Sequence, residues 1–142
     1  MTSGPLPQDS LPDLFDIRDW PVARIRFPQL GEPGRVTRLT EGMDMLIARG
    51  EPFSVMWYVA DHDPEDEPRD DDRAAHVWLK RVRRDLDRLV QGYAYVVPND
   101  KMHAILHERV EKVASKLFSF PIFVTLDEAE ALSRAQGWTA AA

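Results

Sequence analysis

Apolar residues recur along the chain with two different periods, and these periods predict alternating strands and helices. Residues 22–27 alternate between apolar and polar side chains, as expected for a strand with one covered face. Residues 53–59 are almost continuously apolar, which predicts a central strand covered on both faces, as strands in parallel sheets are. Two further strands are predicted at 93–97 and 121–124.

Between these strands, apolar residues at steps of three or four predict amphipathic helices. The first helix begins near Val36 and ends before Gly50, which suits a left-handed helix terminus. The second follows three consecutive aspartates and is predicted to end at Gly92.

Capping residues predict where the last two helices begin. Asn99 or Asp100 is the predicted N-cap of the third helix. Thr125 and Glu128 have the spacing of a capping box for the fourth, which is predicted to stop at Gly137.

The element order β-α-β-α-β-α-β-α predicts right-handed crossovers and a mainly parallel sheet. A length of 142 residues fits one domain. We therefore expect a single α/β domain with a four- to five-stranded sheet at residues 21–138. An extended N-terminal leader (1–20) precedes it, and a short C-terminal tail (139–142) follows it.

The leader is rich in proline but carries a few apolar residues, which are Leu11, Leu14, Phe15, Ile17 and Trp20. We expect them to pack on the domain, because chain termini are ordered mainly where apolar side chains anchor them. The alternatives are a short edge strand at 15–17 and a segment that binds a partner.

Composition excludes several functional classes. The formal net charge of -6 opposes binding to nucleic-acid phosphates. The absence of cysteine excludes disulfides and thiol catalysis. No apolar run reaches the roughly 18 residues of a membrane-spanning helix, and the N-terminus does not resemble a secretory signal, so we expect no membrane insertion and a cytoplasmic location.

A basic cluster on the second helix is interpreted as a solvated face; it comprises Arg73, Lys80, Arg81, Arg83, Arg84 and Arg88.

Acidic residues crowd the segment 61–72, named here the acidic loop, directly after the predicted central strand. Loops at the carboxyl ends of parallel strands commonly bind ligands and partners. A concentrated negative field there would select and steer a basic partner protein. The predicted partner-binding residues are Asp61, His62, Asp63, Glu65, Asp66, Glu67, Asp70, Asp71 and Asp72.

A second hypothesis places a small-molecule pocket at the same strand ends, in an accessory subunit or enzyme. Aromatic side chains with a few polar groups can line such a cleft, although aromatics more often belong to the core. The candidates are Trp57, Tyr58, His62, Tyr95 and Asn99.

Neither a metal site nor catalytic machinery is predicted. The acidic loop departs from a calcium-binding loop, because Asp66 replaces the required glycine and Asp72 replaces the closing glutamate. His103 and His107 share a helix face but lack the glutamate of a His-Glu-x-x-His motif. We expect no cofactor, no metal and no catalytic residue.

Several segments together resemble a divergent STAS-like domain, a family named for sulfate transporters and anti-sigma-factor antagonists. The resemblance spans residues 20–136 and rests on the order and pattern of segments 24–28, 48–53, 78–81, 92–98 and 121–129. It implies a non-enzymatic regulatory module that binds a protein or a small ligand. The family's phosphorylated Ser or Thr would lie in the loop after the central strand, but residues 61–72 contain neither. A structural homo-oligomer, formed through an exposed strand edge or through Leu14, Phe15 and Trp20, is a third hypothesis.

Overall fold

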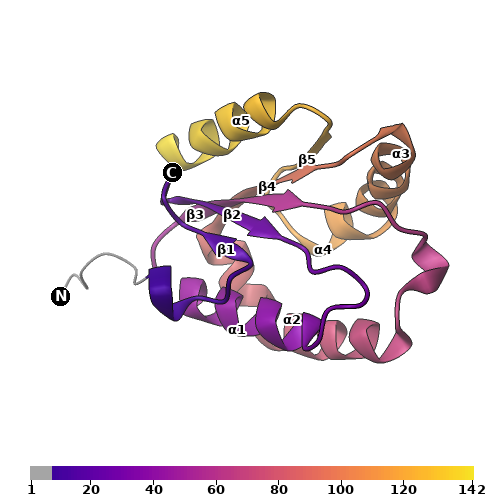
Figure 1. Cartoon of the computed structure of the whole chain (residues 1–142). Coiled ribbons are helices and arrows are strands. Elements are labelled where there is room, and N and C mark those ends of the chain that lie inside the picture. The colour runs from indigo at the N-terminus through magenta and orange to yellow at the C-terminus, as the bar shows by residue number, and fades with distance from the viewer. Residues whose placement is uncertain (1–7) are drawn as a thin grey trace.

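Five strands form one sheet in the order β1-β2-β3-β4-β5 (Figure 1). The computed structural model describes residues 8–142, and residues 1–7 of the predicted leader lie outside the described residues. β1 runs antiparallel to β2, and the other neighbouring pairs are parallel. The prediction of a single α/β domain with a mainly parallel sheet is confirmed. The strands are β1 (Phe15–Asp16), β2 (Val22–Arg26), β3 (Phe53–Tyr58), β4 (Val90–Val96) and β5 (Ile122–Thr125).

Helices alternate with the parallel strands, as predicted. They are α1 (Arg35–Ala48), α2 (Arg69–Leu89), α3 (Asp100–Arg109), the π-helical turn η3 (Val110–Ala114), α4 (Ser115–Leu117) and α5 (Glu128–Ala140). Two short 3-10 turns, η1 (Gln8–Ser10) and η2 (Pro64–Asp66), precede β1 and α2. The six basic residues predicted on the outer face of the second helix are all exposed on α2.

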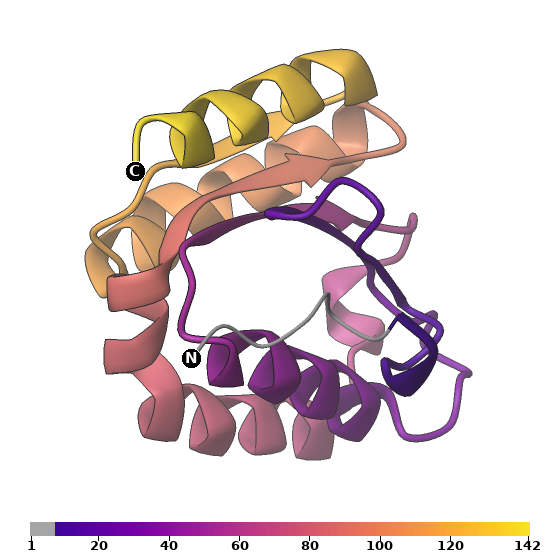
Figure 2. The ribbon, with the colours of Figure 1, turned by 90° about the vertical axis from the view of Figure 1, so that its left-hand side faces the viewer.

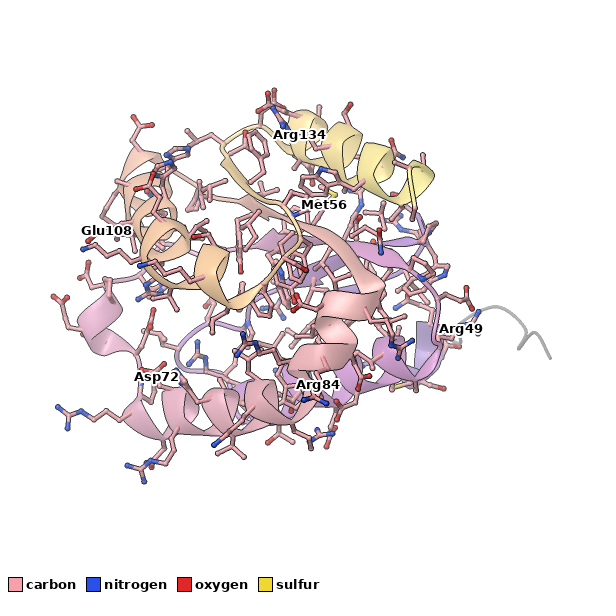
Figure 3. The ribbon with its side chains drawn as sticks, turned by 180° about the vertical axis from the view of Figure 1, so that it is seen from behind. Arg49, Met56, Asp72, Arg84, Glu108 and Arg134 are labelled. Atoms are coloured by element: carbon pink, nitrogen blue, oxygen red, sulfur yellow. The ribbon has the colours of Figure 1, made fainter. Side chains whose placement is uncertain are left out.

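The helices are divided unequally between the two faces of the sheet (Figure 2). Val55 and Trp57 of β3 belong to the core shared with α1 and α2, and α3 packs on the same face beside Val97. Met56 points the other way and is fully buried against Ala131 and Ala135 of α5 (Figure 3). β3 is therefore the predicted central strand, covered on both faces.

Residues 8–20 pack on the domain rather than extending from it. Leu14 and Phe15 are each 3% exposed and lie in the main core cluster, and β1 pairs with the edge of β2. Phe15 lies directly against Gly42 of α1, where an added Cβ would be 2.2 Å from its ring. Two of the side chains predicted as alternative oligomer contacts, Leu14 and Phe15, are thus buried within the domain.

Two residues that were predicted to mark the ends of helices have the predicted role. Gly50 follows α1 with a φ of +69°, the left-handed conformation that glycine adopts without steric cost. Asn99 is the N-cap of α3, and its side-chain oxygen accepts a hydrogen bond from the Met102 amide at 2.9 Å.

Three other residues that were predicted to mark the ends of helices do not have that role. Gly92 lies inside β4 and does not end α2, which passes into the strand at Leu89. Gly137 lies within α5, which continues to Ala140. Asp127, rather than Thr125, caps α5, because its carboxylate accepts from the Ala129 and Glu130 amides. These errors share one cause: glycine and short polar residues have several local roles, and tertiary contacts select among them.

Candidate functional site

A cavity of about 730 Å³ opens at the carboxyl ends of β2, β3 and β4. It lies between the sheet and the helices on one face, bounded by the first turns of α1 and α2 and by η3. We call it the strand-end cavity. Its volume falls in the range of small-molecule pockets.

The topology explains why the cavity forms under the helices. Parallel strands bring their carboxyl ends to the same edge of the sheet, so the loops that follow them converge there. The strand order never reverses along the parallel part, and right-handed crossovers therefore place α1, α2 and α3 on one face. The space left beneath their ends is the strand-end cavity.

Aromatic rings form one wall of the cavity. The Phe27 ring stacks on Trp57 with 4.7 Å between centroids, and Trp57 stacks on Tyr95 at 6.4 Å. Phe27 and Tyr95 line the cavity, whereas Trp57 is 7% exposed and is not among the lining residues. The remaining apolar lining includes Leu39, Leu106 and Val110.

The Tyr95 hydroxyl is a free hydrogen-bonding group on this wall. Burial raises the pKa of Tyr95 above its usual range, in which the hydroxyl is already protonated at neutral pH. The Tyr95 hydroxyl makes no hydrogen bond within the described part of the chain. It can therefore donate to, or accept from, a molecule in the cavity.

Ion pairs attach the acidic loop and the start of α2 to neighbouring helices at the mouth. The Arg35 guanidinium lies 2.6 Å from Asp71, joining α1 to α2. Glu67 accepts from Arg109 of α3 at 3.2 Å and also contacts Nε2 of His62. Nδ1 of His62 lies 3.1 Å from the Ala60 carbonyl oxygen. These four charged side chains and His62 all line the cavity.

The outer part of the acidic loop is attached to α3. Asp61 lies 2.5 Å from Nζ of Lys101 and accepts a hydrogen bond from Nδ2 of Asn99 at 3.0 Å. The hydrogen bond from Lys101 is the main cause that lowers the pKa of Asp61. Asp63 lies 3.6 Å from the same ammonium.

The nine predicted partner-binding residues therefore do not form one uniform acidic surface. Asp61, His62, Asp63, Glu67 and Asp71 make the intramolecular contacts described above. The carboxylates of Glu65, Asp66, Asp70 and Asp72 have no partner among residues 8–142. Asp72 is the member of this second group that lines the cavity; it lies in the first turn of α2, below the helix that carries Glu108 in Figure 3.

The predicted pocket residues are only partly brought together. Tyr95 and His62 line the cavity, and Trp57 supports its aromatic wall. Tyr58 points to the opposite face, where its hydroxyl donates to Glu128 of α5, and burial raises its pKa to about 12. Asn99 is occupied by the α3 cap and by Asp61. Successive strand residues point to opposite faces, so the period of two already separates Tyr58 from Trp57.

Several lining residues were not among the predicted pocket residues, including Phe27, Arg35, Arg109 and Val110. Phe27 could have been found, because it continues the alternation of Ala23 and Ile25 on one face. The other three lie on elements distant in sequence from β3, and no local pattern connects them.

A π-helical turn shapes the wall opposite the sheet. Val110–Ala114 interrupts the helical run between α3 and α4, and both its first and last residues line the cavity. Single π-helical turns within α-helices are frequent at functional sites. The π-helical turn and the cavity are thus two features that distinguish this region from the rest of the domain.

The structure forms no metal cluster from the histidine pair or from the acidic residues among residues 8–142. The rings of His103 and His107 stack with 6.0 Å between centroids on α3. Across residues 8–142, no group of three or more histidine or acidic side chains is arranged to hold a metal ion. Within the same residues, every helix is too short or too polar to cross a bilayer.

Comparison with known proteins identifies no relative: no family model, no curated protein and no solved structure matches this chain.

Proposed function

We propose that this protein binds a small amphiphilic molecule in the strand-end cavity. The observation that carries the proposal is a cavity of about 730 Å³ with mainly apolar walls and several charged side chains among its lining residues. Ligand pockets combine these two properties, because apolar burial supplies affinity and a few polar groups fix orientation.

The local architecture supports the same site. An aromatic wall, the unpartnered Tyr95 hydroxyl and the η3 turn all meet at the cavity. We retain a STAS-like regulatory module as the proposed class, supported by the mainly parallel α/β domain and by the loop that follows its central strand.

Nile red, a neutral dye that fluoresces in apolar surroundings, tests the cavity. Ala75 of α2 lines it, whereas Val77 of the same helix does not and is 68% exposed. An Ala75→Trp variant projects an indole into the cavity, and Val77→Trp places the same indole on the exposed surface of the same helix. We expect Nile red to bind the wild type and Val77→Trp with similar affinity, and Ala75→Trp at least about tenfold more weakly, a difference of about 1.4 kcal/mol.

Circular dichroism and the unfolding temperature establish that both variants are folded. Equal dye binding by folded Ala75→Trp and wild type would show that the cavity is not a binding site. Native mass spectrometry of protein purified from its own host then reports the mass of any retained ligand.

A partner protein that binds the acidic loop is a second candidate function. Glu65, Asp66 and Asp70 are exposed and have no partner within the described chain. Free carboxylates of one sign can steer a basic partner to this surface. They lie outside the strand-end cavity, so both functions can operate in one molecule.

Affinity capture from the native host tests this second candidate. A Glu65→Gln, Asp66→Asn, Asp70→Asn variant should lose a partner that the wild type retains at low salt. The control variant Asp9→Asn, Glu41→Gln, Asp100→Asn changes the charge equally at other exposed positions. A partner captured equally by all three proteins would contradict a role for the acidic loop.

A further inference from the structure

We infer that the ligand of the strand-end cavity is an amphiphilic organic cation: an apolar body with an ammonium or guanidinium group at the mouth. This inference rests on the proposed function and specifies its ligand class. The inference is based on the charged side chains that line the cavity.

The charge balance of the lining is negative. Its four carboxylates and two guanidinium groups are those of Asp61, Glu67, Asp71, Asp72, Arg35 and Arg109. Both arginines are already paired, Arg35 with Asp71 and Arg109 with Glu67. An anionic ligand would therefore have to compete with existing carboxylates for either guanidinium.

Asp72 is the charged group that remains available. Its carboxylate has no ion pair or hydrogen bond among the described residues, although it lies at the cavity lining beside the Arg35–Asp71 pair. A cation placed here gains an ion pair without breaking one. The same position would bring an anion close to a carboxylate that no ion pair neutralises.

The aromatic wall favours a cation as well. Phe27 and Tyr95 line the same cavity, and the face of an aromatic ring attracts a nearby ammonium group. The apolar walls formed by Leu39, Leu106 and Val110 suit the hydrocarbon part of the ligand. An acceptor atom on the ligand can also take the hydrogen bond that the Tyr95 hydroxyl offers.

Three probes of one shape and different charge test the inference: 4-phenylbutylamine, 4-phenylbutanol and 4-phenylbutyrate. Displacement of Nile red from the full-length wild-type protein at neutral pH and low salt measures their relative affinity. We expect the amine to bind at least about tenfold more tightly than the carboxylate, with the alcohol between them. Raising the salt concentration should narrow this difference.

A matched pair of variants locates the charge. Asp72→Asn should weaken amine binding by about two- to fivefold, the range for a partly exposed ion pair, and leave alcohol binding unchanged. Asp70→Asn removes the same charge two residues away, outside the cavity lining, and should bind the amine as the wild type does.

The outcomes separate the two proposals. If the alcohol or carboxylate binds as tightly as the amine, the cationic class is overturned while the cavity remains a binding site. Equal weakening by Asp70→Asn and Asp72→Asn also overturns it, because the effect would then reflect net charge alone. Failure of all three probes to displace Nile red overturns it too, and the dye titration of Ala75→Trp still decides the proposed function.

Discussion

Gly92 of β4 lies directly beneath Trp138 of α5. A Cβ built on Gly92 would be 2.2 Å from Cε3 of the indole, far inside van der Waals contact. The absence of a side chain on the strand therefore lets the helix approach the sheet. The α5 face of the sheet is held by this contact and by the small residues Ala94, Ala131 and Ala135.

Gly92→Ala should destabilise the domain by about 1–3 kcal/mol, the usual effect of overpacking a filled core. Urea unfolding followed by circular dichroism measures the free energy of unfolding. Gly137→Ala is the control, because nothing lies within 4 Å of its added Cβ. Within α5 that substitution should stabilise by up to about 1 kcal/mol. Equal stability of Gly92→Ala and the wild type would show that α5 does not pack as described.

Phe15→Ala should destabilise by about 3–5 kcal/mol, although the residue lies in a two-residue strand near the N-terminus. Its ring is 3% exposed and fills the space above Gly42. Val77→Ala is the matched control, because Val77 is 68% exposed, and should change stability by less than about 0.5 kcal/mol. A small effect of Phe15→Ala in the same urea experiment would mean that residues 8–20 detach readily.

Asn99→Ala should cost about 1 kcal/mol, because it removes the acceptor of the Met102 amide at the start of α3. The same change removes the donor to Asp61, which helps to hold the acidic loop. Asn99→Ser keeps a capping oxygen and should recover most of the stability. Amide hydrogen exchange should increase in the first turn of α3 for the alanine variant; unchanged exchange there would contradict the cap.

Glu32 predicts a dependence of stability on pH. Hydrogen bonds from Arg26, the largest cause, and from the Gln29 amide lower its pKa from 4.5 to about 2. The folded pKa lies below the unfolded one, so the stabilisation is present above about pH 4.5 and is lost as the pH falls towards 2.

The unfolding temperatures of the wild type and Glu32→Gln, measured between pH 7 and pH 2, test this. The difference between them should be constant near neutral pH and shrink below about pH 4.5. Glu41→Gln, an exposed change on α1, serves as the control and should show no such convergence. A constant difference down to pH 2 would contradict the role of Arg26.

Local pattern in the sequence determined the secondary structure and much of the fold class. The alternation at 22–27, the apolar run at 53–59 and the helical spacing between them act over a few residues, so they could be interpreted without tertiary information. The order of elements then implied a mainly parallel sheet. The acidic loop and Tyr95 were placed at the correct edge for the same reason.

Tertiary structure decided what those side chains contact. Five of the nine acidic-loop candidates are held by partners such as Lys101, Arg35 and Arg109, which are 36 to 42 residues away in most pairs. The role of Gly92 depends on Trp138, and Asn99 is diverted from the cavity by the α3 cap. Such contacts form only when the whole chain has folded, so they cannot be predicted from a segment of ten or twenty residues. The sequence alone therefore determined which segments fold into which elements, while packing between distant elements determined the cavity and left the exposed Asp72 unpaired at its lining.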